Sequence, residues 1–67
     1  MNKIEKKNLK IFRIISEYNN TEYQKYAMAD SVKEAIEKFE QYYKDDYPIS
    51  ESEITSVEVV YEEEVLI

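Results

Sequence analysis

The 67-residue sequence contains no cysteine, no histidine and no glycine, and it has a single proline. Without Cys and His it cannot form disulfides, bind zinc through the usual thiolate and imidazole ligands, use imidazole as a catalyst or sense pH through histidine. It also lacks the Gly-rich loops that hold phosphate groups. These absences exclude several large classes of catalytic and metal-dependent protein.

Long apolar runs are absent as well. No run approaches the roughly 20 residues that cross a bilayer, and the polar N-terminus lacks the apolar centre of a secretory signal peptide. The lack of Cys is compatible with a reducing compartment. We therefore expect a cytoplasmic protein without a membrane segment.

The residues that are present are sufficient for one small core. Hydrophobic residues make up 43% of the chain, including seven Tyr and two Phe, although 36% of the residues are charged. A chain this short buries only about 60% of the surface that its unfolded form exposes. We expect a single domain, for which dimerisation is one route to extra stability in the absence of disulfides or a metal.

Residues 9–18 form the first segment with a clear pattern. They are rich in β-branched and aromatic residues, which favours a strand. Apolar residues occupy both of its faces: Leu9, Ile11 and Ile15 on one, Phe12 and Ile14 on the other. The strand is therefore expected at the centre of a sheet or at an oligomer contact. A helix over residues 3–17 is the alternative.

A hairpin is predicted next, because Asn19-Asn20-Thr21 is a turn cluster and Asn tolerates left-handed backbone conformations. The second strand would cover residues 22–29. Its small residues Ala27 and Ala29 suit close approach of a helix, which would leave Tyr26 and Met28 facing outward or toward a partner. A register error of one residue would exchange the two faces.

Ser31 and Glu34 form the pattern of a capping box, in which the Ser hydroxyl accepts from the Glu amide and the Glu carboxylate accepts from the Ser amide. This predicts the start of an amphipathic helix that ends near residues 44–47, because Pro48 disfavours helical geometry before it. The apolar stripe of this helix would contain Val32, Ala35, Ile36, Phe39, Tyr42 and Tyr43.

A last strand is expected over residues 54–61, with Val57, Val59 and Tyr61 on one face and Glu58 and Glu62 on the other. The predicted fold is α+β in β-β-α-β order: a three-stranded, largely antiparallel sheet, the third strand beside the first, and one helix on one face. Residues 1–8 would be a flexible basic arm, residues 9–61 the domain, and residues 62–67 an extension or a continuation of the last strand.

The net charge of −6 is unevenly distributed along the chain. Residues 1–13 hold Lys3, Lys6, Lys7, Lys10 and Arg13 against Glu5 alone, whereas residues 45–67 hold eight acidic residues and no basic one. Such segregation points to the partners of a protein rather than to its fold. Direct nucleic-acid binding by the basic arm would be weak and opposed by the acidic remainder.

The acidic residues predict a partner-binding surface. Its expected members are Glu34, Glu37, Glu40, Asp45, Asp46, Glu51, Glu53, Glu58, Glu62, Glu63 and Glu64. A dense anionic array resembles the phosphates of a nucleic-acid duplex and would suit the cationic groove of a nucleic-acid-binding protein. In size and charge the chain resembles small acidic phage-encoded inhibitors, including several anti-CRISPR proteins, and this implies an anti-defence inhibitor.

Two further contact regions follow from the residue types. Tyr26 and Tyr61 are candidates for partner contact, because Tyr is enriched in binding surfaces. Val65, Leu66 and Ile67 would form an oligomer contact, which supports the alternative function: a structural or accessory protein that self-associates through its edge strand and tail. Glu62, Glu63 and Glu64 have the carboxylates that a hard cation such as calcium prefers, but the sequence has no Gly-turned ligand loop, and residues 45–53 lack the spacing of one. We expect no enzyme, no catalytic residue, no cofactor and no metal site.

Overall fold

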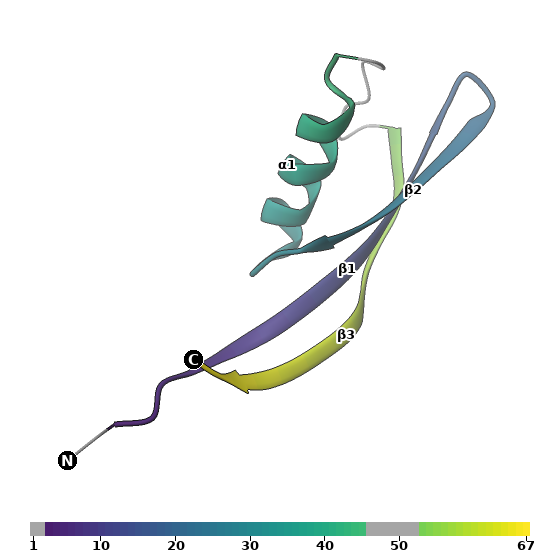
Figure 1. Ribbon diagram of the computed structural model, residues 1–67. Helices are drawn as coiled ribbons and strands as arrows, with labels where there is room; N and C mark the ends of the chain where they lie inside the picture. The colour runs from purple at the N-terminus through teal and green to yellow at the C-terminus, as the bar shows by residue number, and fades with distance from the viewer. Residues whose placement is uncertain (1–2, 46–52) are drawn as a thin grey trace.

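The computed structural model, which describes residues 3–45 and 53–67, has one helix and one sheet of three strands. The elements are β1 (Lys6–Tyr18), β2 (Thr21–Met28), α1 (Val32–Tyr43) and β3 (Ile54–Leu66). Both strand pairs are antiparallel in the order β2-β1-β3, and α1 covers one face of the sheet (Figure 1). The predicted α+β class and β-β-α-β order are confirmed.

β1 is the central strand and pairs along its length with one or both neighbours. Alternate residues Phe12, Ile14 and Ser16 are buried on the side of α1, whereas Ile11, Arg13 and Ile15 on the opposite side are only half-buried. The strand prediction for this segment is confirmed against the helical alternative. Its second apolar face, however, has no covering layer among the described residues.

The turn between β1 and β2 has two central residues, Asn19 and Asn20, with φ of 52° and 62°. Two successive left-handed residues match the right-handed twist of the flanking strands, and Asn adopts this conformation more easily than most residues other than Gly. Tyr18 and Thr21 close the turn as the first strand pair. The expected hairpin is present.

The core lies between α1 and the sheet. Its buried apolar residues are Phe12, Ile14, Ala29, Ala35, Phe39 and Tyr43. Ala27 and Ala29 do face the helix as expected, and Tyr26 and Met28 face away. The Tyr43 ring lies 5.0 Å from the Phe39 ring and 5.5 Å from the Tyr23 ring, centroid to centroid, so aromatic contacts join α1 to β2.

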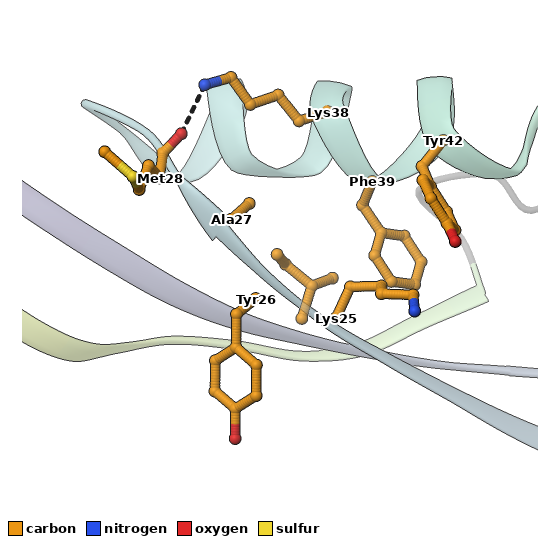
Figure 2. A pocket seen from close by; sticks show the side chains of 8 residues that line it. Lys25, Tyr26, Ala27, Met28, Lys38, Phe39 and Tyr42 are labelled. Carbon is orange, nitrogen blue, oxygen red and sulfur yellow. Dashed lines mark hydrogen bonds between the residues drawn. The ribbon is translucent and has the colours of Figure 1, made fainter.

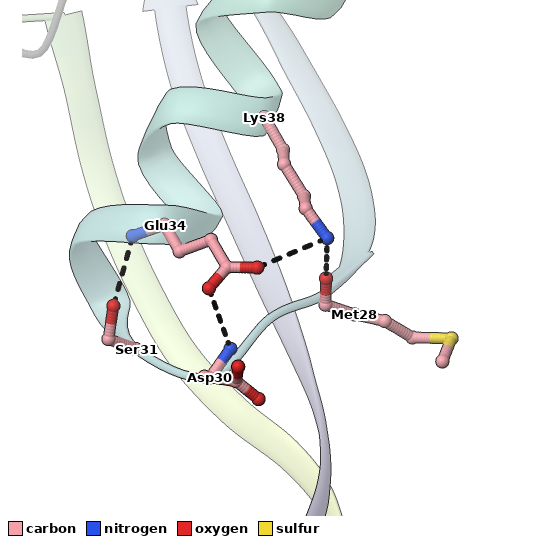
Figure 3. A network of polar contacts seen from close by, with 5 residues as sticks. All are labelled: Met28, Asp30, Ser31, Glu34 and Lys38. Carbon is pink, nitrogen blue, oxygen red and sulfur yellow. Dashed lines mark hydrogen bonds and ion pairs between the residues drawn. The ribbon is translucent and has the colours of Figure 1, made fainter.

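The start of α1 is fixed by a polar network (Figure 3). The Glu34 amide donates to Ser31 Oγ over 3.1 Å, which confirms the predicted N-cap. The Glu34 carboxylate, however, accepts from the Asp30 amide at 3.4 Å rather than from the Ser31 amide. Lys38 Nζ lies 3.4 Å from the same carboxylate and donates to the Met28 carbonyl, which ties the helix to the end of β2.

The apolar stripe of α1 is narrower than the sequence suggested. Val32 and Tyr42 are 49% and 62% exposed, so neither belongs to the core. Ala35, Phe39 and Tyr43 are four residues apart and point at the sheet, whereas Tyr42 lies one position to the side. Its ring instead contacts Tyr43, and Lys25 Nζ lies 5.1 Å from its centroid.

β3 contains two register shifts against β1. Because of the shift at Val60, the prediction that Tyr61 shares a face with Val57 and Val59 is wrong. Phe12 pairs with Val59 and Ile11 with Tyr61, so one residue of β3 is inserted between two consecutive pairs. A bulge of this kind turns the following side chains to the other face. Val57 and Val59 therefore face the helix side as a pair, but Tyr61 does not join them.

The two ends of the described chain lie side by side. Lys6 pairs with Leu66, and the Ile67 amide donates to the Glu5 carbonyl over 3.0 Å. Residues 62–66 thus continue β3, and β1 begins at Lys6, within the segment expected to be a flexible arm. This β1–β3 ribbon extends beyond α1 and β2 (Figure 1). The radius of gyration is 14.7 Å, against about 11 Å for a compact chain of this length.

Truncation of Phe39, which the helix inserts into the core, is predicted to unfold the domain. Phe39→Ala should lower the free energy of unfolding by about 3–5 kcal/mol, because a buried aromatic side chain leaves a cavity. Chemical denaturation followed by circular dichroism measures this loss. The matched control is Tyr42→Ala, since Tyr42 is exposed one turn away. Equal melting of wild type and Phe39→Ala would show that the helix is wrongly placed.

Removal of the buried Ser16 hydroxyl is predicted to have the opposite effect. Ser16 is fully buried, and its Oγ has no hydrogen-bond partner among the residues described. Because an unsatisfied buried hydroxyl is costly, Ser16→Ala should raise the free energy of unfolding by about 1 kcal/mol. Urea unfolding compares it with Ser56→Ala on the opposite face. A clear loss of stability in Ser16→Ala would mean that the hydroxyl is satisfied in solution.

Candidate functional site on the uncovered face of the sheet

The face of the sheet opposite α1 has apolar side chains and no covering element among the described residues. We call it the uncovered face. Cross-strand partners share a face, so its members follow from the register. They are Lys7, Leu9, Ile11, Arg13, Ile15 and Glu17 of β1, Glu22, Gln24, Tyr26 and Met28 of β2, and Ser56, Glu58, Tyr61, Glu63 and Val65 of β3.

The centre of the uncovered face combines aliphatic and aromatic side chains. Ile11 lies between Met28 of β2 and Tyr61 of β3, and in the next row Arg13 lies between Tyr26 and Glu58. The structure thus brings Tyr26 and Tyr61, the two aromatic residues expected at a contact, to the same face. They are 60% and 45% exposed, and each is adjacent to a half-buried β1 residue.

The bulge at Val60 places the side chain of Tyr61 on the uncovered face. Without the inserted residue, the period of two along β3 would place Tyr61 beside Val57 and Val59 on the helix side. The sequence therefore predicted Tyr61 as a contact residue but did not predict which side chains lie beside it. Arg13, Ile11 and Met28 were not proposed as site residues, although apolar residues at alternate positions of residues 9–15 indicated that the strand has a second apolar face.

One ion pair crosses the uncovered face. Arg13 forms it with Glu58 across the β1–β3 pair, while the Arg13 Nε is buried without a hydrogen-bond partner among the described residues. Because each charge has its counterion beside it, the pair does not give the centre of the face a net charge. It therefore does not oppose an apolar contact as strongly as an isolated charge would.

Tyr61 and Glu63, two residues apart on β3, contact each other at the edge of the same face. The Tyr61 hydroxyl donates to the Glu63 carboxylate, and this hydrogen bond raises the pKa of Tyr61 above its ordinary value of 10.0. Partial desolvation and the negative charge of Glu63 act in the same direction. The phenol is therefore neutral over the whole physiological pH range, and its proton is used in the hydrogen bond to Glu63.

The acidic residues expected to form one array lie on different parts of the molecule. Glu58 and Glu63 lie on the uncovered face, whereas Glu62 and Glu64 lie on the other side of the ribbon. Glu34, Glu37 and Glu40 are on α1, and Asp45 follows that helix. Glu53 is half-buried at the start of β3 and has an interaction partner. Asp46 and Glu51 lie outside the described residues.

The basic and acidic segments of the sequence are adjacent in space. Antiparallel pairing of β1 with β3 places Lys10 opposite Glu62 and Arg13 opposite Glu58, and Lys6 Nζ lies 3.8 Å from Glu64. These cations lower the negative potential around Glu58, Glu62 and Glu64. The strong charge segregation along the chain is therefore reduced in the fold, and the row of Glu58, Glu62 and Glu64 is interrupted by the bulge.

The tail expected at an oligomer contact is partly integrated into the sheet. Val65 is half-buried on the uncovered face, opposite Lys7. Leu66 and Ile67 are exposed, and the backbone of Ile67 is held by Glu5. These residues therefore form the end of the ribbon rather than a separate hook.

A shallow groove of about 440 Å³ lies between β2 and α1 (Figure 2). Its apolar floor contains Ile14 and Phe39, and Lys25 and Lys38 are its charged residues. Both lysines have partners within the chain: Lys25 lies near the Tyr42 ring, and Lys38 bonds Met28 and Glu34. Figure 2 also shows Tyr26 pointing away from the helix.

The described residues contain neither a cluster of metal-binding side chains nor a membrane-spanning helix. Within residues 3–45 and 53–67 no three acidic side chains come together in a way that could hold a metal ion. The helix in this part of the chain is too short and too polar to cross a membrane. No protein-family model, curated protein or solved structure matches the chain.

The contact between Tyr61 and Glu63 predicts a measurable titration. Glu63→Gln should lower the pKa of Tyr61 toward 10.0, which NMR of the ring protons over a basic pH series would detect. Because the folded-state pKa is raised, the contact stabilises the fold below the unfolded pKa and loses this effect as pH rises through the folded pKa. Glu62→Gln, on the other side of the ribbon, is the control. A Tyr61 pKa unchanged in Glu63→Gln would contradict the contact.

Proposed function

We propose that this chain is a non-catalytic protein-binding module whose contact surface is the uncovered face. The observation that carries the proposal is the position of Tyr26 and Tyr61, which come from opposite edges of the sheet and lie exposed beside Ile11 and Arg13. Tyr provides large contact area at low entropic cost, and Arg is also enriched in interfaces. Exposed apolar surface of this kind, bounded by charged residues, is typical of protein contacts.

A narrower proposal concerns the chemistry of the partner. The net charge of −6 supports a partner with a basic surface, as in an inhibitor that mimics nucleic-acid phosphates. The geometry gives this proposal less support than the composition does, because Glu58 and Glu64 have cationic partners and the bulge separates the acidic row of β3. The acids of α1, such as Glu37 and Glu40, are on a different face.

Paired tyrosine substitutions test the proposed contact surface. The wild-type chain is immobilised, proteins captured from a lysate of its source cells are identified by mass spectrometry, and their affinities are measured with purified partner. Tyr26→Ser with Tyr61→Ser should weaken binding at least about a hundredfold, because each exposed Tyr removed from a contact centre costs about 2 kcal/mol. Tyr42→Ser, an equally exposed Tyr on α1, should leave the affinity unchanged.

Two other results of this experiment would contradict the proposed contact surface. Equal binding by wild type and the double variant would overturn the uncovered face as the contact surface. Loss of binding in Glu37→Lys with Glu40→Lys, but not in the tyrosine variant, would instead favour the acidic helix and the phosphate-mimic proposal. Circular dichroism of each variant shows whether the fold is retained.

A further inference from the structure

We infer that the uncovered face binds a second copy of this chain, stacked face to face about a two-fold axis that runs across the strands. This inference rests on the proposed function and specifies the partner. Three observations support it: the amount of exposed surface, the order of charges along β1, and the residues that the axis brings together.

The accessible surface of the chain is larger than expected for a folded monomer. It measures 5207 Å², whereas a compact monomer of this mass exposes about 4,500 Å². The extended β1–β3 ribbon and the uncovered face both contribute to this excess of about 700 Å², which is similar in size to the roughly 800 Å² that each partner buries in a specific interface. A sheet covered on both faces would also be the ordinary arrangement for a strand such as β1, which has apolar residues on both sides.

The charges along the uncovered side of β1 are ordered. Lys7 lies near one end and Glu17 at the other end, beside Glu22 of β2. Between them are Leu9, Ile11 and Ile15, and Arg13, whose charge is paired with Glu58. Along β1 this face thus has a cation at one end and a carboxylate at the other, so the strand is complementary to itself when it is reversed. If two copies stack with their strands antiparallel, Lys7 of each lies over Glu17 of the other. If the strands run parallel, like charges face each other.

The same reversed stacking also matches the central residues. An axis that passes level with residue 12 places Leu9 over Ile15 of the other copy, and Ile11 over Arg13, whose charge is paired with Glu58. On β2 it places Tyr26 over Met28, which is a favourable aromatic–thioether contact. On β3 it places the Tyr61 ring over Glu58 of the other copy, while the Tyr61 hydroxyl keeps its hydrogen bond to Glu63 and Glu58 keeps its ion pair with Arg13.

Association along the outer edge of β3 is less favourable. The outer edge of β3 carries Glu62, Glu63 and Glu64 in succession, and pairing two β3 edges about a two-fold axis would bring these acids together. The Val60 and Thr55 register shifts also interrupt that edge. The stacked arrangement avoids this repulsion because the acid-rich edges lie at the periphery.

Charge exchange at the two ends of β1 tests the arrangement. Analytical ultracentrifugation of the wild type over a wide concentration range should give twice the 8.1 kDa mass of the chain. Lys7→Glu or Glu17→Lys alone should weaken the dimer about tenfold, because each substitution makes both symmetry-related contacts repulsive. The double variant, in which both charges are exchanged, should restore wild-type affinity.

Mixing the two single variants provides an independent measurement. In the mixed dimer, the Glu introduced at position 7 of one chain lies over the Lys introduced at position 17 of the other, and the second contact is the native Lys7–Glu17 pair. Both contacts are then attractive. Heterodimers should therefore form at concentrations at which neither single variant forms a homodimer. The exposed charges Lys33 and Glu37 of α1 provide the matched control. Lys33→Glu and Glu37→Lys should leave self-association unchanged.

The results separate this inference from the proposed function. A wild type that stays monomeric at every concentration overturns the second copy as partner, as does a dimer that responds to the α1 variants but not to the β1 variants. If such a monomer still binds another protein through Tyr26 and Tyr61, the proposed function stands without the self-association. If the tyrosine variant changes neither interaction, both proposals fail.

Discussion

A single short helix can cover only part of one sheet face. α1 has 12 residues and β1 has 13, which correspond to about 18 Å of helix and about 43 Å of strand. The helix therefore packs over the region where β1 pairs with β2, and the β1–β3 ribbon continues beyond it. The division into one buried face, one uncovered face and one extended ribbon follows from this difference in length.

On the buried face, small and large side chains together fill the space between the short helix and the sheet. Ala29 and Ala35 allow the helix to approach the sheet closely, and Phe12, Phe39 and Tyr43 then fill the space between them. A small core of this kind leaves little excess stability in a short chain. A layer on the second face would protect Ile11 and Ile15 from water and add the burial that the helix cannot supply.

Antiparallel pairing of the two ends of the chain explains the electrostatics. The basic residues of β1 and the acidic residues of β3 are distant in sequence, yet Lys6, Lys10 and Arg13 lie beside acids of β3 in the sheet. Exposed ion pairs of this type contribute little stability individually. Their larger effect is on register, because sliding the strands would place Lys10 or Arg13 beside Val59 and Val60.

The sequence predicted the order of the elements, the hairpin and the N-cap, because each depends on local signals. Asn19 and Asn20 determine a turn by their own conformational preferences, and Ser31 determines a helix start by its own hydrogen bond. The period of two in β2 also placed Ala27 and Tyr26 on the correct faces. These features require no knowledge of distant residues.

The composition of the uncovered face could not be predicted in the same way. The Val60 bulge has no Gly or other local marker, and it arises from fitting β3 to the opposite strand. One inserted residue moved Tyr61 away from Val57 and Val59 and separated Glu58 from Glu62. The spatial pairing of basic and acidic segments likewise depends on long-range register. The apolar stripe of α1 is narrower than predicted because Val32 is exposed at the first residue of the helix and Tyr42 lies to one side of Ala35, Phe39 and Tyr43.

The pairing of the chain ends also determines how the protein folds. The β1–β2 hairpin and α1 are formed by residues close in sequence, so they can assemble early on a fast timescale. β3 joins β1 through contacts as distant as Lys6 with Leu66, and closing so long a loop has a large entropic cost. We therefore expect β3 to dock after the hairpin and the helix have formed, and until it docks the central strand has a free edge that is open to pairing with other chains.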